Sequence, residues 1–192
     1  MPFAFRFIQF YLLLLLIFMG CQSTPGHTPA SLKQPVSILD LENEIHAEIN
    51  HIRQKNGWMP LDWDHTLKVI ALEHSRDMIA MNYFDHISPA GETPTERGLK
   101  NNYICRITEG GHIREGLAEN LFKTSLYEFM TVQGDEISYE WRSHSKIIKN
   151  VVNKWLRSPD HRKNLLHPDY RKTGIGIAVD NNYEIWITQN FC

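Results

Sequence analysis

Residues 174–191 of the chain, GIGIAVDNNYEIWITQNF, contain two stretches in which apolar residues alternate with other side chains. Isoleucine and valine occupy every second position from 175 to 179, and a second alternation runs from Glu184 to Phe191. A period of two residues is typical of β-strands, because successive side chains point to opposite faces of a sheet. Asn181-Asn182 between the two stretches favours a tight hairpin turn. The C-terminal part therefore predicts an antiparallel hairpin within a small sheet.

Upstream of this hairpin, apolar residues recur every three or four positions, which is the period of an amphipathic α-helix. These stripes, with capping residues at their starts, predict helices over residues 38–56, 64–82, 93–100 and 143–157. Ser158-Pro159 can start a further short helix, with Ser158 as its cap. Several helices and few strands indicate an α+β protein, in which helices must cover both faces of the sheet.

The middle of the chain has weaker patterns. Alternation over residues 117–122 predicts one more strand. Residues 101–114 are polar and are expected to be irregular. Residues 123–142 allow no assignment beyond a turn at Gly134-Asp135.

The first twenty residues differ in composition from the rest. Arg6 is their only charge, and the apolar run from Tyr11 to Met19 is short for a membrane span, so residues 1–20 are predicted to be a secretory signal. Gly20-Cys21 ends this run as in a bacterial lipobox, in which the cysteine is lipidated and becomes the mature N-terminus. Ordinary cleavage near Gly20 and an uncleaved signal anchor are the alternatives.

The remaining chain divides into a tether and a domain. Residues 21–37 contain several prolines and are expected to form a flexible tether, whereas residues 38–192 are long enough for a hydrophobic core. Export predicts an extracellular protein, or a lipoprotein anchored at the cell surface or in the periplasm with membrane contact through its N-terminus only. The net charge of −2, without a basic block, argues against nucleic acid as a partner.

The three cysteines fit this picture. An exported chain meets an oxidising compartment, so Cys21 is assigned to lipidation and Cys105 and Cys192 to a disulfide. Two free buried thiols are the alternative. No Cys-x-x-Cys pair occurs, so a structural zinc knot is not expected.

Three polar residues in separate motifs are the candidate functional site: His86, Glu119 and His161. Two imidazoles and a carboxylate can hold a divalent metal such as zinc, or transfer a proton. Glu119 lies in the predicted strand between two leucines, and burial of a lone charge is costly, so a cation, proton or metal should lie beside it. His161 lies in a first helical turn, where the helix dipole lowers the pKa of an imidazole. Glu115 is a possible additional ligand, four residues before Glu119.

Other motifs are absent or weaker. His74 lies on an apolar helical stripe and is interpreted as a hydrogen-bonded core histidine. The chain has neither His-Glu-x-x-His nor Gly-x-Ser-x-Gly, which argues against the familiar zinc-protease helix and the serine-hydrolase elbow.

Five ordered motifs resemble the CAP superfamily of cysteine-rich secretory proteins, antigen 5 and plant pathogenesis-related proteins, and most closely its prokaryotic, SCP-like branch. They comprise residues 74–91, Glu119-Asn120, residues 155–166, Gly174-Ile175-Gly176 and the closing residues 188–192. The resemblance spans nearly the whole predicted domain.

The resemblance implies an α-β-α sandwich with a central antiparallel sheet and a cleft that holds two histidines and two glutamates. This tetrad is reported to bind zinc or similar metals in some members. By motif position, His86, Glu119 and His161 correspond to three members of the tetrad. The usual position of the second glutamate is Ser158, so the tetrad is incomplete. The short sterol-binding motif of some members is not recognisable.

These observations predict a secreted or surface-tethered CAP domain whose cleft, formed by His86, Glu119 and His161, binds a ligand, a metal or a partner. The partner is expected to be an extracellular ligand or a component of the cell envelope. Two alternatives are open: a metal-dependent hydrolase of peptides or cell-wall polymers, in which the same residues hold zinc, and a protein that binds lipid between its helices.

Overall fold

The computed structural model describes residues 36–192, and the predicted signal sequence, Cys21 and nearly all of the tether lie outside the described residues. A central sheet has the strand order β1 (Asp62–Trp63), β7 (Lys172–Val179), β8 (Glu184–Phe191) and β4 (Ala118–Ser125). The three long strands are antiparallel, and the two-residue β1 runs parallel to β7.

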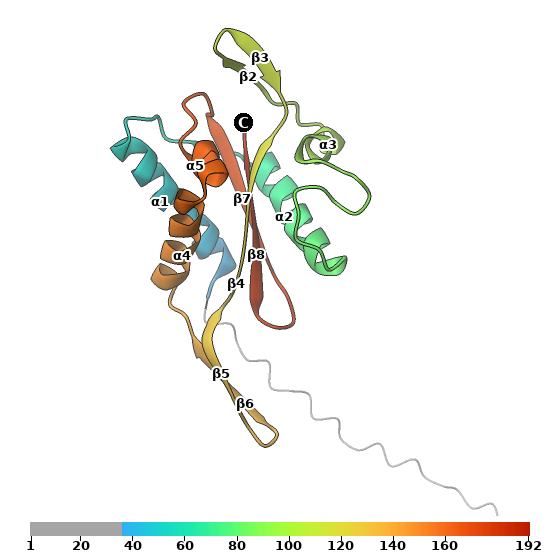
Figure 1. Cartoon of the computed structure of the whole chain (residues 1–192), viewed down its shortest axis with the longest axis vertical. Coiled ribbons are helices and arrows are strands. Elements are labelled where there is room, and N and C mark those ends of the chain that lie inside the picture. The colour runs from blue at the N-terminus through green and yellow to red at the C-terminus, as the bar shows by residue number, and fades with distance from the viewer. Residues whose placement is uncertain (1–35) are drawn as a thin grey trace, which may run out of the picture. The chain divides into compact units, whose positions relative to one another are not determined.

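Helices cover both faces of this sheet (Figure 1). On one face lie α1 (Ile38–Lys55), α4 (His144–Arg157) and the short α5 (Pro159–Leu165). On the other face lie α2 (His65–Ala80) and α3 (Pro94–Lys100). The predicted α+β sandwich is therefore confirmed.

The helices begin where the sequence places capping residues. The side chains of Ser37, Asp64 and Ser143 accept hydrogen bonds from backbone amides in the first turns of α1, α2 and α4. Thr93 and Glu96 form the expected capping box at the start of α3. The apolar stripes of α1 and α4 face the sheet and are almost completely buried, and this burial is the main source of stability.

Two glycines let α2 lie directly on β7. A Cβ atom at Gly174 or Gly176 would come within 2.1 Å of a backbone nitrogen of α2. Where α2 and β7 meet, the Ser75 hydroxyl donates to the Gly176 carbonyl at 2.9 Å. The Gly-x-Gly pattern is therefore a packing device that joins helix and strand, and any side chain there would push them apart.

Three expectations for the loops were wrong or incomplete. Residues 101–114 are not irregular, because β2 (Arg106–Glu109) and β3 (His112–Glu115) form a hairpin. Residues 123–142 hold a second hairpin, β5 (Tyr127–Gln133) and β6 (Glu136–Trp141), with the predicted turn at Gly134. The β7–β8 turn is longer than the predicted two residues, because the Asp180 side chain accepts from the amides of Asn182 and Glu184 and holds a wider loop.

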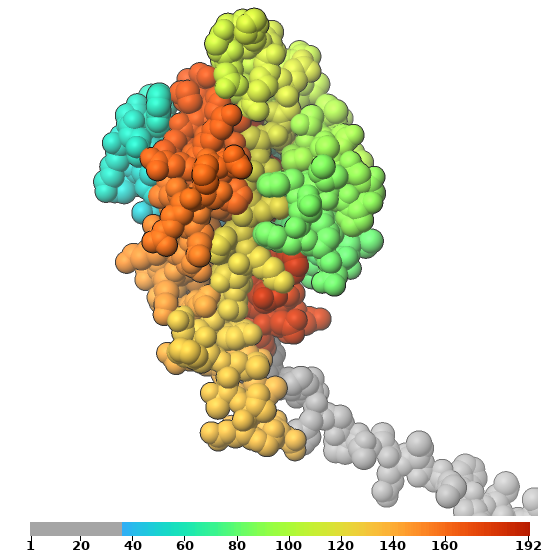
Figure 2. Space-filling model, viewed as in Figure 1, coloured from blue at the N-terminus to red at the C-terminus, as the bar shows by residue number. Residues whose placement is uncertain are grey.

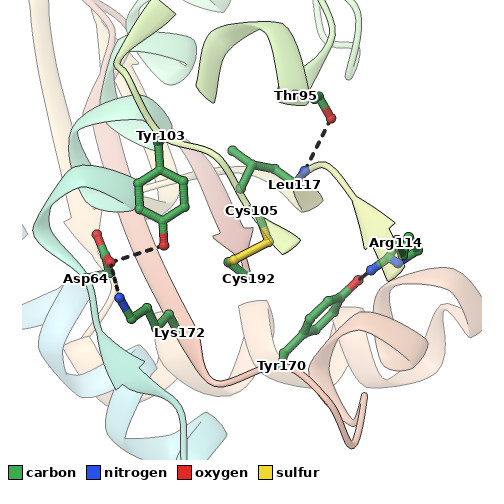
Figure 3. Close-up of a disulfide and its surroundings, with 9 residues drawn as sticks. All are labelled: Asp64, Thr95, Tyr103, Cys105, Arg114, Leu117, Tyr170, Lys172 and Cys192. Atoms are coloured by element: carbon green, nitrogen blue, oxygen red, sulfur yellow. Dashed lines mark hydrogen bonds and ion pairs between the residues drawn. A yellow bond between two sulfur atoms is a disulfide. The ribbon is translucent and has the colours of Figure 1, made fainter. Parts of the chain in front are cut away.

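The Cys105–Cys192 disulfide is present and joins the start of β2 to the residue after β8 (Figure 3). The two Cα atoms lie 5.6 Å apart, and the bond spans 87 positions of the chain. Nearby, Tyr103 and Lys172 both contact Asp64, and Arg114 donates to the Tyr170 hydroxyl. These contacts fix the β2–β3 hairpin against the end of the sheet.

Between residues 36 and 192, none of the helices is both long enough and apolar enough to cross a membrane.

Candidate functional site

His86 lies in the loop that follows α2, and this loop is closed by its own hydrogen bonds. The Asp85 carboxylate accepts from the Ile87 amide at 2.9 Å, and the Ser88 hydroxyl accepts from the Glu92 amide at 3.1 Å. The side chain of His86 is 46% exposed. The loop thus presents a partly exposed imidazole in a fixed position.

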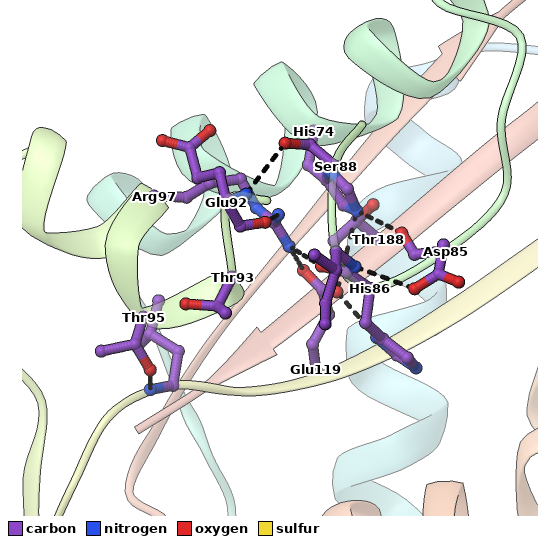
Figure 4. Close-up of polar contacts among 12 residues, drawn as sticks. His74, Asp85, His86, Ser88, Glu92, Thr93, Thr95, Arg97, Glu119 and Thr188 are labelled. Carbon is purple, nitrogen blue, oxygen red and sulfur yellow. Dashed lines mark hydrogen bonds and ion pairs between the residues drawn. The ribbon is translucent and has the colours of Figure 1, made fainter. Parts of the chain in front are cut away.

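Glu119 lies on β4, and its carboxylate is buried and fully engaged. Oε1 accepts from Nδ1 of His86 at 2.8 Å, and Oε2 accepts from the Arg97 guanidinium at 2.7 Å (Figure 4). Only 1% of the Glu119 side chain is exposed. The sequence predicted a cation, a proton or a metal beside this carboxylate, and the structure supplies a cation, Arg97.

Arg97 belongs to α3 and was not among the predicted site residues. Besides Glu119, it donates to the backbone carbonyls of His86 and Glu92 at 3.1 and 3.0 Å. One buried guanidinium therefore holds both the carboxylate and the loop that carries His86 (Figure 4). The only signal in the sequence was the need of Glu119 for a cation, and this need does not say which of the basic residues provides it.

His74 is a buried core histidine, as interpreted from its apolar stripe. Its Nε2 donates to the Asp85 carbonyl at 3.1 Å and lies 3.8 Å from Oε1 of Glu119. Burial lowers the pKa of His74, although the nearby Glu119 charge opposes this shift. The neutral ring anchors the loop of His86 to α2.

His161 comes from the opposite helical layer, in the first turn of α5. This helix docks on β4 through two asparagines: Asn120 donates to the His161 carbonyl at 3.1 Å, and Asn164 donates to the Glu119 carbonyl at 3.1 Å. The other end of α5 is held by the buried Arg53, which donates to the Leu165 carbonyl at 2.7 Å. Burial lowers the pKa of Arg53 to about 10.

The pKa values of the two site histidines shift in opposite directions. The hydrogen bond to Glu119 raises the pKa of His86 above its ordinary value. Partial burial, followed by the positive charge of His86, lowers the pKa of His161. The site therefore combines an imidazole that favours its protonated form with one that favours its neutral form.

Glu115 is separate from this group. It lies on β3 and pairs with Arg106 at 2.7 Å, with both side chains more than half exposed. Among residues 36–192, no cluster of three or more histidine, cysteine or acidic side chains has a geometry suited to holding a metal ion. A hollow of about 290 Å³ adjoins the network on the side of α2 and α3, and its lining includes His74 and Arg97 rather than the three predicted residues.

Comparison with known proteins matches residues 46–191 to the cysteine-rich secretory protein family, CAP. The chain belongs to the CAP family. The Bacillus subtilis protein YkwD, described as uncharacterized, is 30% identical over 177 residues, which is 88% of this chain and 56% of that protein. The CAP chain thus spans about half the length of this relative.

Two solved structures share the fold. An outer surface protein of Borrelia burgdorferi is 22% identical, with a TM-score of 0.58 over 81% of this CAP chain and 95% of the other. An extracellular protein containing an SCP domain from Bacillus anthracis is 26% identical, with a TM-score of 0.54 over 80% of this chain and 40% of the other. The resemblance to the prokaryotic branch is therefore confirmed.

In this CAP domain, Ser158 stands where the resemblance places a second glutamate. It occupies the N-cap position of α5, but its side chain makes no capping hydrogen bond, contrary to its predicted role. Proline at the first position of α5 fixes the start of the helix instead.

Proposed function

We propose that this CAP domain binds a ligand of the cell envelope at the surface formed by His86, Glu119 and His161. The observation that carries the proposal is the engagement of both Glu119 oxygens by groups of the protein. A carboxylate held in this way orients His86 and favours its protonated form. It is poorly placed to act as a general base, because Arg97 would have to leave first.

The chemistry of the two imidazoles suggests what is bound. The Nδ1 atom of His86 is hydrogen-bonded to Glu119, so Nε2 is the nitrogen that can contact a ligand. A protonated His86 donates through Nε2 to an anionic or carbonyl oxygen, and a neutral His161 donates or accepts. Carboxylate-bearing polymers of the cell wall offer such oxygens. Binding should weaken as the pH rises through the raised pKa of His86, because the imidazolium then loses its charge.

Zinc is the second candidate ligand, favoured by the contact between Glu119 and His86. A carboxylate that fixes one nitrogen of a histidine often leaves the other nitrogen for a metal. His86 and His161 would be the nitrogen ligands, and Glu119 would orient His86 rather than bind the metal. Two protein ligands are fewer than the three of catalytic zinc sites, so this arrangement gives little support to the hydrolase alternative.

We also propose that the protein is exported and acts at the cell envelope. The support is the apolar N-terminal run from Tyr11 to Met19, which is followed by Gly20-Cys21, together with the disulfide. The names of the two structural relatives place those proteins at an outer surface and outside the cell. Mass spectrometry of the native protein tests the anchoring, because diacylglycerol on Cys21 distinguishes a lipoprotein from a freely secreted chain.

Co-sedimentation with purified peptidoglycan tests the binding site. We expect His86→Ala and His161→Ala each to weaken binding by about tenfold, since each removes a hydrogen bond to a charged group. His112→Ala is the matched control, because His112 is exposed on the β2–β3 hairpin. Wild-type binding should be stronger at about pH 6 than at about pH 8.

Two results would contradict this proposal. Equal binding by all three variants would show that the histidines are not the site. Release of soluble fragments that stops in His86→Ala and His161→Ala would establish the hydrolase instead. Calorimetric titration of the same proteins with zinc shows whether the two imidazoles bind metal.

A further inference from the structure

The β5–β6 hairpin is a separate two-stranded sheet that projects from the body of the domain (Figures 1 and 2). Four of its large apolar side chains are exposed: Phe129 at 62%, Met130 at 49%, Val132 at 57% and Ile137 at 49%. An isolated hairpin is marginally stable in water, and a cluster of exposed apolar residues usually marks a contact surface. The hairpin therefore has the character of a docking element.

The register of the hairpin places most of these side chains on one face. Met130 lies opposite Tyr139, and Val132 lies opposite Ile137. Residues two positions apart share a face of a strand, so Met130 and Val132 of β5 form one apolar face with Ile137 and Tyr139 of β6. At the base of the hairpin this face continues into a stack of Tyr139 on Trp141, with ring centroids 5.1 Å apart.

The charges on the hairpin are all negative. Residues 124–141 contain four carboxylates and no lysine, arginine or histidine. Glu128, at the base, pairs with two basic side chains of the domain. In the described part of the chain, no ion pair is formed by Asp135, Glu136 or Glu140. In β6, Glu136 and Glu140 alternate with Ile137 and Tyr139, so these two carboxylates lie on the face opposite the apolar one, and Asp135 lies at the turn.

This charge selects among the possible occupants. The hairpin of a second copy would bring like charges together, and the anionic headgroups of a membrane would also be repelled. A cationic partner gains from the same carboxylates. Because the sheet has only two strands, each strand also has an outer edge whose backbone groups can pair with an added strand.

We propose that the β5–β6 hairpin binds an extended segment of a partner polypeptide in which basic and apolar residues alternate. The apolar side chains of this segment cover Met130, Val132 and Ile137, its basic side chains pair with Asp135, Glu136 and Glu140, and its backbone adds a third strand. This surface is distinct from the histidine site and is independent of the function proposed for it.

The test uses the full chain and a short fluorescent peptide that alternates lysine and valine. We expect saturable binding by fluorescence anisotropy and slower hydrogen exchange of the amides in residues 127–141. The triple variant Asp135→Asn, Glu136→Gln, Glu140→Gln should bind about tenfold more weakly, since it removes three partly exposed ion pairs. Val132→Thr with Ile137→Thr should weaken binding similarly, while β-branched threonine preserves the strands.

A matched control is available on the β2–β3 side of the domain. Ile104→Thr with Ile113→Thr changes two isoleucines that are 62% and 70% exposed, and it should leave peptide binding unchanged. Peptides that alternate glutamate with valine, or lysine with serine, should bind more weakly than the lysine-valine peptide.

The proposal is overturned if the lysine-valine peptide does not bind, or if it binds the triple variant as well as wild type. It is also overturned if residues 127–141 become protected from exchange with rising protein concentration alone, because a second copy is then the occupant. Vesicle binding that is lost in Val132→Thr with Ile137→Thr would assign the face to a membrane instead.

Discussion

Replacing Arg97 with methionine tests whether the buried ion pair organises the site. The side chains of Arg97 and Glu119 are 7% and 1% exposed, and their charged atoms are 2.7 Å apart. Arg97→Met preserves much of the side-chain volume but leaves the carboxylate buried without its cation. Breaking a buried pair in this way typically costs about 3–5 kcal/mol. In a domain of this size, such a loss lowers the melting temperature by roughly 6–20 °C.

The control is a pair with the same separation in a different environment. Arg106 and Glu115 are also 2.7 Å apart, but their side chains are 63% and 59% exposed. Arg106→Met should cost about 0–1 kcal/mol, because water solvates the released carboxylate. Urea unfolding followed by tryptophan fluorescence measures both variants under the same conditions.

Two further measurements separate charge from packing. Arg97→Met combined with Glu119→Gln should recover part of the lost stability, because no charge is then left buried and unpaired. Mild acid should reduce the loss of stability in Arg97→Met relative to wild type, since burying a protonated carboxyl costs less free energy than burying a carboxylate. If Arg97→Met loses no more stability than Arg106→Met at neutral pH, Arg97 is not the counter-charge that the site depends on.

Three other predictions concern the site and the scaffold. By NMR titration, the pKa of His86 should exceed its ordinary value of 6.5 and should fall in Glu119→Gln. The stabilisation from this contact is complete below pH 6.5 and is lost as the pH rises through the folded-state pKa. If wild type and Glu119→Gln give the same pKa for His86, the contact does not stabilise the imidazolium. Gly176→Ala should cost more than about 3 kcal/mol in urea unfolding, because its Cβ meets the backbone of α2, and a small cost would refute that contact. Reduction of Cys105–Cys192 should cost about 4–5 kcal/mol for a separation of 87 positions, and unchanged unfolding in reductant would contradict this.

The helices and the C-terminal hairpin could be predicted because their signals are local. The capping box at Thr93, the apolar stripe of α4 and the alternation before Phe191 each lie within one segment of the chain. Each pattern also agrees with the burial that the fold imposes. Local patterns therefore defined the layers of the sandwich and the strand that carries Glu119.

The two additional hairpins could not be predicted in the same way. Only Ile107 is buried within the four residues of β2, so no alternation marks this strand. In β6 the apolar residues alternate from Ile137 to Trp141, but most of the apolar side chains of β5 and β6 are exposed, so this short pattern is not reinforced by burial in the core. These strands depend on cross-strand pairing and, for β2, on the disulfide at Cys105, which are contacts between distant residues.

The arrangement of the site follows from the position of β4 at the edge of the central sheet. At an edge strand, side chains from both helical layers can reach the same point. Arg97 of α3 reaches the carboxylate of Glu119, whereas Asn164 of α5 binds the Glu119 backbone. His86 and His161 are thereby brought from opposite layers of the sandwich to one strand. Because Arg97 already balances the buried charge of Glu119, the described domain can hold this geometry with protein groups alone.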